Sequence, residues 1–397
     1  MNRAPGAISA LAPRPRGGGG GGHAAVVSRG GAEGGDQVQL LPAGGGAPLP
    51  LPLPGRASRL RCVAFNPQAE FCLAVGAVGR VWLLQRRPRR LWPRGAAGGG
   101  GGALRPGARE PPPAKRPRAA PQALQQPALG GGAAGAAGAA VGADEGLAEP
   151  LELRLPGACS EQEVVSVAFC PAGGMVAAAT EGAVFVWNMA AAGDSGCCTR
   201  LAFAGGDGCR VSWAPTGGYL CAHNSAGDGP GRLKIWETCA WTGREWELKS
   251  VARASAWHPS GGTLLLGAAD GCLYNISLGQ DHAGRGRRPP LAASALRFVA
   301  KHALGRREAH RGGVVGLAWG AAGSWLAVAS GPSGGGAALL RVYATGVGSD
   351  GAVSLSEQRG RELKDDVNAE APCLAWARGQ LTALAADGRD VRTLDLN

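Results

Sequence analysis

Residues 232–267, with the sequence RLKIWETCAWTGREWELKSVARASAWHPSGGTLLLG, decide the fold. One apolar segment in this stretch ends at Trp236, and a second ends at Trp257. The sequence HPSGG at 258–262 follows the second segment, and the apolar run at 264–266 comes shortly after it. Proline lacks a backbone donor and glycine tolerates positive φ, so HPSGG is typical of a tight turn. The stretch therefore predicts a strand, a connection and then an antiparallel hairpin.

The same frame recurs along the chain as an aromatic residue followed by a glycine-rich turn. It is found, in whole or in part, at 63–67, 167–174, 211–218, 256–262, 317–323 and 374–376. Phe169, Trp213 and Trp257 follow one another at spacings of 44 residues, and the later spacings are 62 and 57 residues. The bulky residues that close a later strand in each repeat are Trp82, Trp187, Trp236, Tyr274, Tyr343 and Leu394. A period of about 40 to 45 residues is typical of four-stranded blades, so we predict an all-β, WD40-type β-propeller with six visible repeats.

Two segments have compositions that do not support a packed core. The chain of 397 residues contains 69 glycines and 28 prolines, and both residue types are frequent at 1–55 and 86–148. Such segments bury too little apolar surface to offset the entropy lost on ordering. We predict a disordered N-terminal segment at 1–55, a propeller domain at 56–397 and a disordered insert at 86–148. An organellar transit peptide is the alternative for the N-terminus, although this segment has only two serines and no amphipathic period.

The net charge of +12 comes from two segments of the chain. Residues 80–118 carry eleven basic residues and one acidic residue, and residues 280–311 carry eight basic and two acidic residues. The rest of the chain is therefore slightly acidic. This distribution indicates solvated loops, and it predicts a second, basic insert at 279–312. Nucleic-acid binding through the basic inserts is an alternative function, but the inserts hold few aromatic residues for base stacking.

A short basic cluster lies within the first insert and consists of Lys115, Arg116 and Arg118. Clusters of this kind serve as nuclear import signals, and they also occur as solvated linkers. Both interpretations stay open.

The sequence contains no motif that predicts catalysis. The GDSG sequence at 193–196 is similar to the nucleophile loop of chymotrypsin-like proteases, but no histidine lies in a matching context. No phosphate-binding loop, nucleophile elbow or zinc-spaced cysteine pair is present. Several of the eleven cysteines fall in or beside apolar runs, which indicates buried, reduced thiols. We predict a non-enzyme without cofactor, metal site or small-molecule substrate, and no apolar run is long enough to span a membrane.

Residues 235–262 resemble the aladin-like WD-repeat nucleoporins of the nuclear pore complex. The similarity rests on a Trp-Glu pair, a Trp-Thr pair and a further tryptophan, all at the family's spacing before the AWHPSGG turn. It extends more loosely over 59–85 and 151–396. The chain departs from the family at its last repeat, which is short, and at residues 1–58, where no first blade is recognisable.

The resemblance implies a function as well as a fold. It implies seven blades and a non-catalytic scaffold of the nuclear pore complex, held at the nuclear envelope through a transmembrane nucleoporin. The implied partners are other nucleoporins, the implied process is nucleocytoplasmic transport, and no specific nucleic acid is expected. The alternative within the same fold is a generic WD-repeat adaptor, such as a substrate receptor of a ubiquitin ligase.

Trp241, Arg244 and Trp246 are the candidate partner-binding residues. Two tryptophans five positions apart are unusual on an outer strand that faces water, and a rigid indole beside an arginine is typical of an interface anchor. If both lay in one strand, alternation would place them on opposite faces, so we expect one indole buried and the other exposed. The alternative is that both pack sideways against neighbouring blades.

Deleting residues 88–146 is expected to leave the fold intact. Closing a surface loop costs only about 0.6 kcal/mol for each doubling of its length, so the melting temperature of the shortened chain should stay nearly unchanged. Thermal unfolding followed by circular dichroism measures this. Aggregation of the deletion variant, or a melting temperature many degrees lower, would show that the segment has a structural role.

Overall fold

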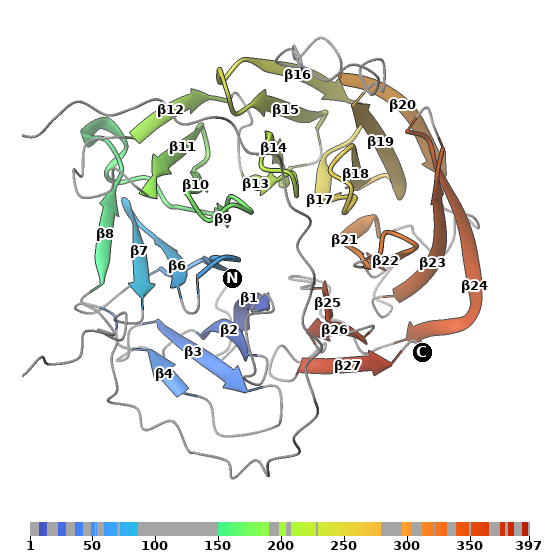
Figure 1. Ribbon diagram of the computed structural model, residues 1–397, viewed down its shortest axis with the longest axis horizontal. Helices are drawn as coiled ribbons and strands as arrows, with labels where there is room; N and C mark the ends of the chain where they lie inside the picture. The colour runs from blue at the N-terminus through green and yellow to red at the C-terminus, as the bar shows by residue number, and fades with distance from the viewer. Residues whose placement is uncertain are drawn as a thin grey trace, which may run out of the picture. The chain divides into compact units, whose positions relative to one another are not determined.

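Strands make up nearly all of the secondary structure in the computed structural model of the chain (Figure 1). One short 3-10 helix, Gly157–Cys159, is also described. The predicted all-β class is therefore confirmed. The structure describes residues 8–13, 23–28, 36–42, 49–51, 53, 59–69, 72–85, 150–189, 198–203, 208–227, 229–278, 296–303, 312–320, 322–331, 339–348, 351–364, 374–377, 380–384 and 391–395.

The chain divides into two compact units. One consists of residues 1–86 and 147–397, and it contains every strand described below. The other consists of residues 87–146 and lies outside the described residues. The predicted insert at 86–148, together with Lys115, Arg116 and Arg118, therefore also lies outside them.

The described strands form seven sheets, each built from strands that are consecutive in the chain. Six sheets have four strands and the last has three, and every pairing is antiparallel. The first three sheets are β1–β4 (Ile8–Pro13, His23–Ser28, Gln37–Pro42, Leu49–Leu51), β5–β8 (Cys62–Phe65, Cys72–Ala77, Arg80–Gln85, Leu151–Arg154) and β9–β12 (Ser166–Phe169, Met175–Ala179, Ala183–Asn188, Cys198–Ala202). The remaining four are β13–β16 (Cys209–Trp213, Tyr219–Asn224, Gly231–Glu237, Gly243–Leu248), β17–β20 (Ala252–Trp257, Thr263–Ala268, Cys272–Leu278, Leu296–Ala303), β21–β24 (Val314–Trp319, Trp325–Ser330, Leu339–Val347, Val353–Lys364) and β25–β27 (Leu374–Ala377, Gln380–Leu384, Val391–Asp395).

The hydrophobic core is divided into clusters that lie between consecutive sheets. The cluster shared by β5–β8 and β9–β12 contains Leu83 and Leu153 from the first sheet and Phe169 and Phe185 from the second. Each of the other clusters likewise joins one sheet to the next. The first strand of each sheet also contacts the first strand of the following sheet, from β1 and β5 through to β21 and β25. A sheet that is covered on both faces needs continuous apolar runs, and the second strands Cys72–Ala77, Tyr219–Asn224 and Thr263–Ala268 are accordingly buried at every residue.

The glycine-rich turns of the repeats share one geometry. The backbone N–H of Gly217 donates to the carbonyl of Ala214, and that of Gly261 donates to the carbonyl of His258, both at 2.8 Å. The two glycines have φ of 73° and 76°, which is the left-handed region that favours glycine. The hairpins predicted from these sequences are confirmed as β13 with β14 and β17 with β18.

The bulky residues that mark each repeat lie on equivalent strands, although Trp82 and Tyr274 lie two positions earlier in the register than the others. They all lie in the third strand of their sheets: Trp82, Trp187, Trp236, Tyr274, Tyr343 and Leu394. The strands predicted around Trp236, Trp257 and residues 264–266 correspond to β15, β17 and β18. The sequence pattern located these strands because the same succession of strands and turns recurs in each sheet.

The N-terminal segment at 1–55 differs from the expected disorder. Strands β1–β4 lie within it and form a four-stranded sheet. Val27, Val38 and Leu51 of this sheet are buried in a cluster shared with Leu73 and other residues of the next sheet. The strands are short and separated by glycine and proline, so the average composition of the segment concealed their apolar residues. A seventh sheet therefore exists where the sequence had shown no repeat.

The basic insert predicted at 279–312 also needs a correction. Leu296–Ala303 within it forms β20, which pairs with β19 as the outermost strand of its sheet. Edge strands commonly carry charged residues, so the basic residues of this segment did not exclude a strand. Residues 279–295 and 304–311 lie outside the described residues.

Tryptophans at the ends of first strands link consecutive sheets by hydrogen bonds. Nε1 of Trp213 donates to the carbonyl of Ala168 in β9 at 3.1 Å. Nε1 of Trp319 donates in the same way to Ala256 in β17 at 3.3 Å. Trp257 holds the equivalent position in β17, but its buried Nε1 has no hydrogen-bond partner in the described part of the chain.

Replacing each of these tryptophans by phenylalanine separates the hydrogen bond from the packing. Trp213→Phe should lower the free energy of unfolding by about 1 kcal/mol more than Trp257→Phe, because both variants lose the same ring volume and only the first loses a bond. Equilibrium denaturation in urea measures the difference. Equal losses for the two variants would show that the bond between sheets contributes nothing.

Candidate functional site

The candidate residues lie on the outermost strand of the sheet β13–β16 and in the turn that leads into it. Strand β15 is third in that sheet and β16 is the outermost (Figure 1). The register places Trp246 opposite Leu233 and Arg244 opposite Ile235. Arg244 and Trp246 therefore share the face of the sheet that carries the buried side chains of these two β15 residues. Trp241 precedes β16, in the turn that connects the two strands.

Trp241 is held in a left-handed turn. Its φ is 53°, and its backbone N–H donates to the carbonyl of Glu237 at 2.8 Å. Glu237 in turn donates its backbone N–H to Thr242 at 2.8 Å, which closes the turn. The half-buried indole meets the ring of Trp213 edge-on, with centroids 6.3 Å apart and an angle of 71° between the planes. Trp241 thus packs against the cluster between β9–β12 and β13–β16.

Trp246 leans toward the opposite neighbour. Its indole is half-buried against the cluster between β13–β16 and β17–β20. The guanidinium carbon of Arg244 lies 5.2 Å from the ring centroid, within the range of a cation–π interaction. Arg244 itself is exposed, so the pair presents a positive charge and part of an indole on the outermost strand.

The expectation that one indole is buried and the other exposed is wrong, because both are half-buried. Strand alternation does not apply to Trp241, which lies in a turn rather than in β16. The alternative, that both indoles pack sideways against neighbouring sheets, agrees with their contacts. A role of Trp241, Arg244 and Trp246 in partner binding stays a prediction.

Basic residues also lie over the tryptophans of two third strands. Lys234 Nζ is 5.5 Å from the ring centroid of Trp236, and it forms an ion pair with Glu245 of β16 at 3.7 Å. In β15, and also in β7, the basic residue is two positions before the tryptophan, so the two side chains share a face of the strand. This spacing is visible in the sequence, and it is the signal by which the contact of Lys234 with Trp236 and Glu245 could have been found.

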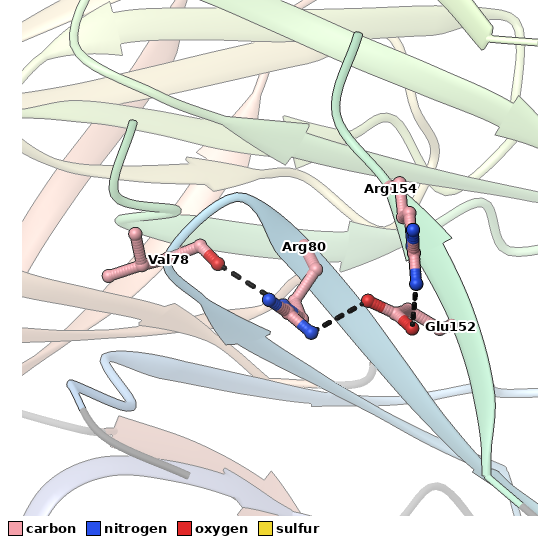
Figure 2. A network of polar contacts seen from close by, with 4 residues as sticks. All are labelled: Val78, Arg80, Glu152 and Arg154. Carbon is pink, nitrogen blue, oxygen red and sulfur yellow. Dashed lines mark hydrogen bonds and ion pairs between the residues drawn. The ribbon is translucent and has the colours of Figure 1, made fainter. Parts of the chain in front are cut away.

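The second example is Arg80 of β7, whose polar contacts with the turn before β7 and with β8 are drawn in Figure 2. Arg80 lies over Trp82, with its guanidinium carbon 5.6 Å from the ring centroid. Nη1 of Arg80 contacts the Glu152 carboxylate at 2.8 Å, and Nε of Arg80 donates to the Val78 carbonyl at 3.4 Å (Figure 2). Arg154 contacts the same carboxylate at 3.2 Å. Exposed ion pairs of this kind contribute at most about 1 kcal/mol, so they orient the side chains more than they stabilise the fold.

Trp246 distinguishes the sheet β13–β16 from the other described sheets. The outermost strands of the other four-stranded sheets contain no tryptophan: β4, β8, β12, β20 and β24. The other tryptophans of the described strands lie on first, second or third strands. An indole on an outermost strand is therefore a feature of this sheet that the other described four-stranded sheets do not share.

Most of the described cysteines are buried thiols, and burial governs their chemistry. Burial raises the pKa of the Cys62 and Cys209 thiols to about 12 and that of Cys72 to about 11. A thiol with a raised pKa is a poor nucleophile, because the thiolate is the reactive form. Over the residues that the structure describes, no group of three or more His, Cys, Asp or Glu residues is arranged to hold a metal ion.

His223 is a fully buried titratable group in β14. Burial lowers the pKa of its imidazole to about 4, partly offset by the nearby carbonyl of Asn224. Its Nδ1 lies 3.2 Å from that carbonyl. Burial also lowers the pKa of His258, whose ring packs edge-on against Trp319 at 4.8 Å. Both histidines therefore favour the neutral form in the folded protein.

Comparison with known proteins identifies no relative: no protein-family model matches the chain, and neither does any curated protein sequence. Among the described residues, no helix has the length and apolar character that a membrane crossing requires.

The depressed pKa of His223 predicts acid destabilisation. Its contribution to stability is fully present above the unfolded pKa near 6.5, and it is lost as the pH falls from there toward 4. In this range the unfolded chain takes up the proton and the folded chain does not. The free energy of unfolding therefore falls by about 1.4 kcal/mol for each pH unit. The stability difference between the wild type and His223→Leu should therefore shrink as the buffer is acidified, as measured by urea denaturation. A constant difference would contradict the assignment.

Proposed function

We propose that the protein is a seven-bladed, WD40-type β-propeller that acts as a non-catalytic scaffold of the nuclear pore complex. In this proposal it is held at the nuclear envelope through a transmembrane nucleoporin, binds other nucleoporins and supports nucleocytoplasmic transport. The motive is the resemblance of residues 235–262 to the aladin-like WD-repeat nucleoporins.

Two features of the sheets support the propeller part of the proposal. There are seven described sheets, and six of them have the four consecutive antiparallel strands of a blade. Their clusters and first strands join each sheet to the next in chain order. A propeller is the architecture in which four-stranded sheets are repeated around an axis with their faces packed together.

One observation supports the scaffold part above the others, and it concerns Trp246. This indole lies half-exposed on an outermost strand, and the exposed Arg244 lies over its ring. Tryptophan and arginine are the residue types most enriched among those that dominate binding energy at protein interfaces. The indole loses little conformational entropy on binding because the cluster between the sheets already holds one side of it.

Localisation of a fluorescently tagged protein tests the proposal directly. The wild type should give a continuous nuclear-rim pattern, and a diffuse or purely cytoplasmic pattern would favour a generic adaptor instead. Replacing Trp246 or Arg244 by alanine should abolish the rim pattern. We expect Trp246→Ala to cost clearly less stability than the roughly 3 to 5 kcal/mol typical of a buried tryptophan, because part of the side chain already faces water.

Two control variants separate binding from folding. Trp236→Ala removes a buried ring of the same sheet and should lower stability by the full amount expected of a core residue. Arg80→Ala removes a cation that lies over a tryptophan in another sheet, and it should leave localisation unchanged. If Trp246→Ala destabilises as strongly as Trp236→Ala, or if its rim pattern persists, the anchor role is wrong.

A further inference from the structure

Trp241 occupies a strained turn at one end of the sheet β13–β16. Its φ of 53° lies in the left-handed region, which bulky residues rarely adopt. Such conformations persist only where the surrounding structure holds them, and they are concentrated at binding and catalytic sites. Here the turn is closed by two backbone hydrogen bonds, which join Glu237 to Trp241 and to Thr242. The fold therefore imposes the position of this indole against the preference of its own backbone.

The turn that carries Trp241 lies against a second turn of the same sheet, residues 214–218. Oγ1 of Thr238 donates to the Gly217 carbonyl at 2.9 Å, and the backbone N–H of Thr238 donates to the Gly218 carbonyl at 3.0 Å. The Trp241 indole packs against the buried Trp213, which directly precedes the second turn. The two turns therefore form one surface, and the indole is fixed on that surface before any ligand binds.

The indole N–H of Trp241 is an unused donor that solvent can reach. In the described part of the chain, its Nε1 has no hydrogen-bond partner. The Nε1 atoms of Trp187 and Trp257 are also unpaired there, but those two atoms are buried and that of Trp241 is not. Trp213 and Trp319 use the same donor to join consecutive sheets. Trp241 therefore presents both an aromatic surface and a free donor.

The surface around Trp241 is uncharged and has small side chains. Residues 214–218, APTGG, and residues 238–242, TCAWT, contain no Asp, Glu, Lys or Arg. The exposed residues of the two turns are Pro215, Thr216, Cys239, Ala240 and Thr242. Several carbonyls of these turns already accept hydrogen bonds from the chain: those of Ala214, Gly217, Gly218 and Thr242. A ligand therefore meets an aromatic ring and a donor, while part of the backbone acceptors is already engaged.

We propose that Trp241 binds a proline-rich segment of a partner protein in the polyproline II conformation. Proline has no backbone N–H, so such a segment brings carbonyl acceptors for the indole donor and few donors that need acceptors. Its rings pack against aromatic side chains, and its preformed conformation loses little entropy on binding. The absence of charge from the two turns favours this segment over an acidic or basic one, because a charge would lose its hydration without gaining a partner.

A partner fits this surface better than the chain's own run of prolines at 111–113 does. Glu110 directly precedes that run, and Lys115 and Arg116 follow it closely, so charged residues flank it on both sides. Binding of this run is a distinct outcome, and the experiment below separates it. The inference concerns Trp241 and not Trp246, and it does not depend on the nuclear-pore assignment.

Titration of the full-length chain with decaproline tests the proposal by nuclear magnetic resonance. The indole N–H signal that is missing from Trp241→Phe identifies Trp241. This signal should shift when decaproline is added, and it should stay in place when a glycine-serine peptide of the same length is added, because that peptide is a flexible coil. Trp241→Phe keeps an aromatic ring but loses the donor, so it should bind decaproline about three- to tenfold more weakly. Trp246→Phe is the matched control, and it should bind within about twofold of the wild type.

A second measurement uses only the wild type, so it holds even if Trp241→Phe fails to fold. Cys239 is an exposed thiol two residues before Trp241 in the same turn. Bound decaproline should shield it and slow its alkylation by iodoacetamide, as followed by mass spectrometry. The alkylation of the half-buried Cys272, which lies in the next sheet, should keep its rate and serves as the control.

Three results would overturn the proposal. The first is that decaproline neither shifts the Trp241 signal nor slows the alkylation of Cys239. The second is that Trp241→Phe and Trp246→Phe bind decaproline equally well, which would show that the indole donor of Trp241 makes no bond. The third is that deleting residues 88–146 shifts the Trp241 signal before any peptide is added, which would assign the surface to the chain's own prolines. A nuclear-rim pattern in a protein that does not bind decaproline would leave the scaffold proposal standing independently.

Discussion

The fold depends on the packing of each sheet between two neighbours. Apolar side chains on both faces of the middle strands meet those of the preceding and following sheets, and the core consists of these shared clusters. The sheets approach so closely that a Cβ atom at Gly267 would collide with Val314 of the next sheet. Burial of the second and third strands therefore supplies most of the stabilisation, at about 25 cal/mol for each Å² of apolar surface removed from water.

Hydrogen bonds and aromatic contacts set the relative positions of neighbouring sheets. The indole bonds of Trp213 and Trp319 each join one first strand to the first strand before it. The ring of Tyr219 stacks on Trp257 across the same kind of boundary, with centroids 6.5 Å apart. Apolar contact alone is tolerant of sliding, whereas a directed N–H donor accepts a narrow range of positions. The tryptophans of the repeat therefore fix geometry as well as filling space.

The outermost strands are released from these constraints, and function is best sought there. Strand β16 carries an indole with a guanidinium over its ring, and the outermost strands of the other described four-stranded sheets carry no indole. Strand β27 has the place of a third strand and an outer edge without a described neighbour.

The sequence by itself determined the repeated part of the fold. Strands around Trp213, Trp236 and Trp257 were located because their periodic apolar runs and glycine turns are local signals that repeat. The sequence also singled out Trp241 and Trp246, because it placed both on a predicted outer strand, where tryptophans are unusual. These inferences needed only the preferences of neighbouring residues.

Only the tertiary structure decided the rest. The first sheet was not predicted, because its short strands are separated by glycine and proline. Val38 and Leu51 can be recognised as core residues only once they pack against the next sheet. The half-burial of both indoles could not be derived from parity, because the turn at Trp241 ends one strand before the next begins. Whether a side chain is covered depends on sheets distant in the sequence. That is a property of packing, which local sequence does not encode.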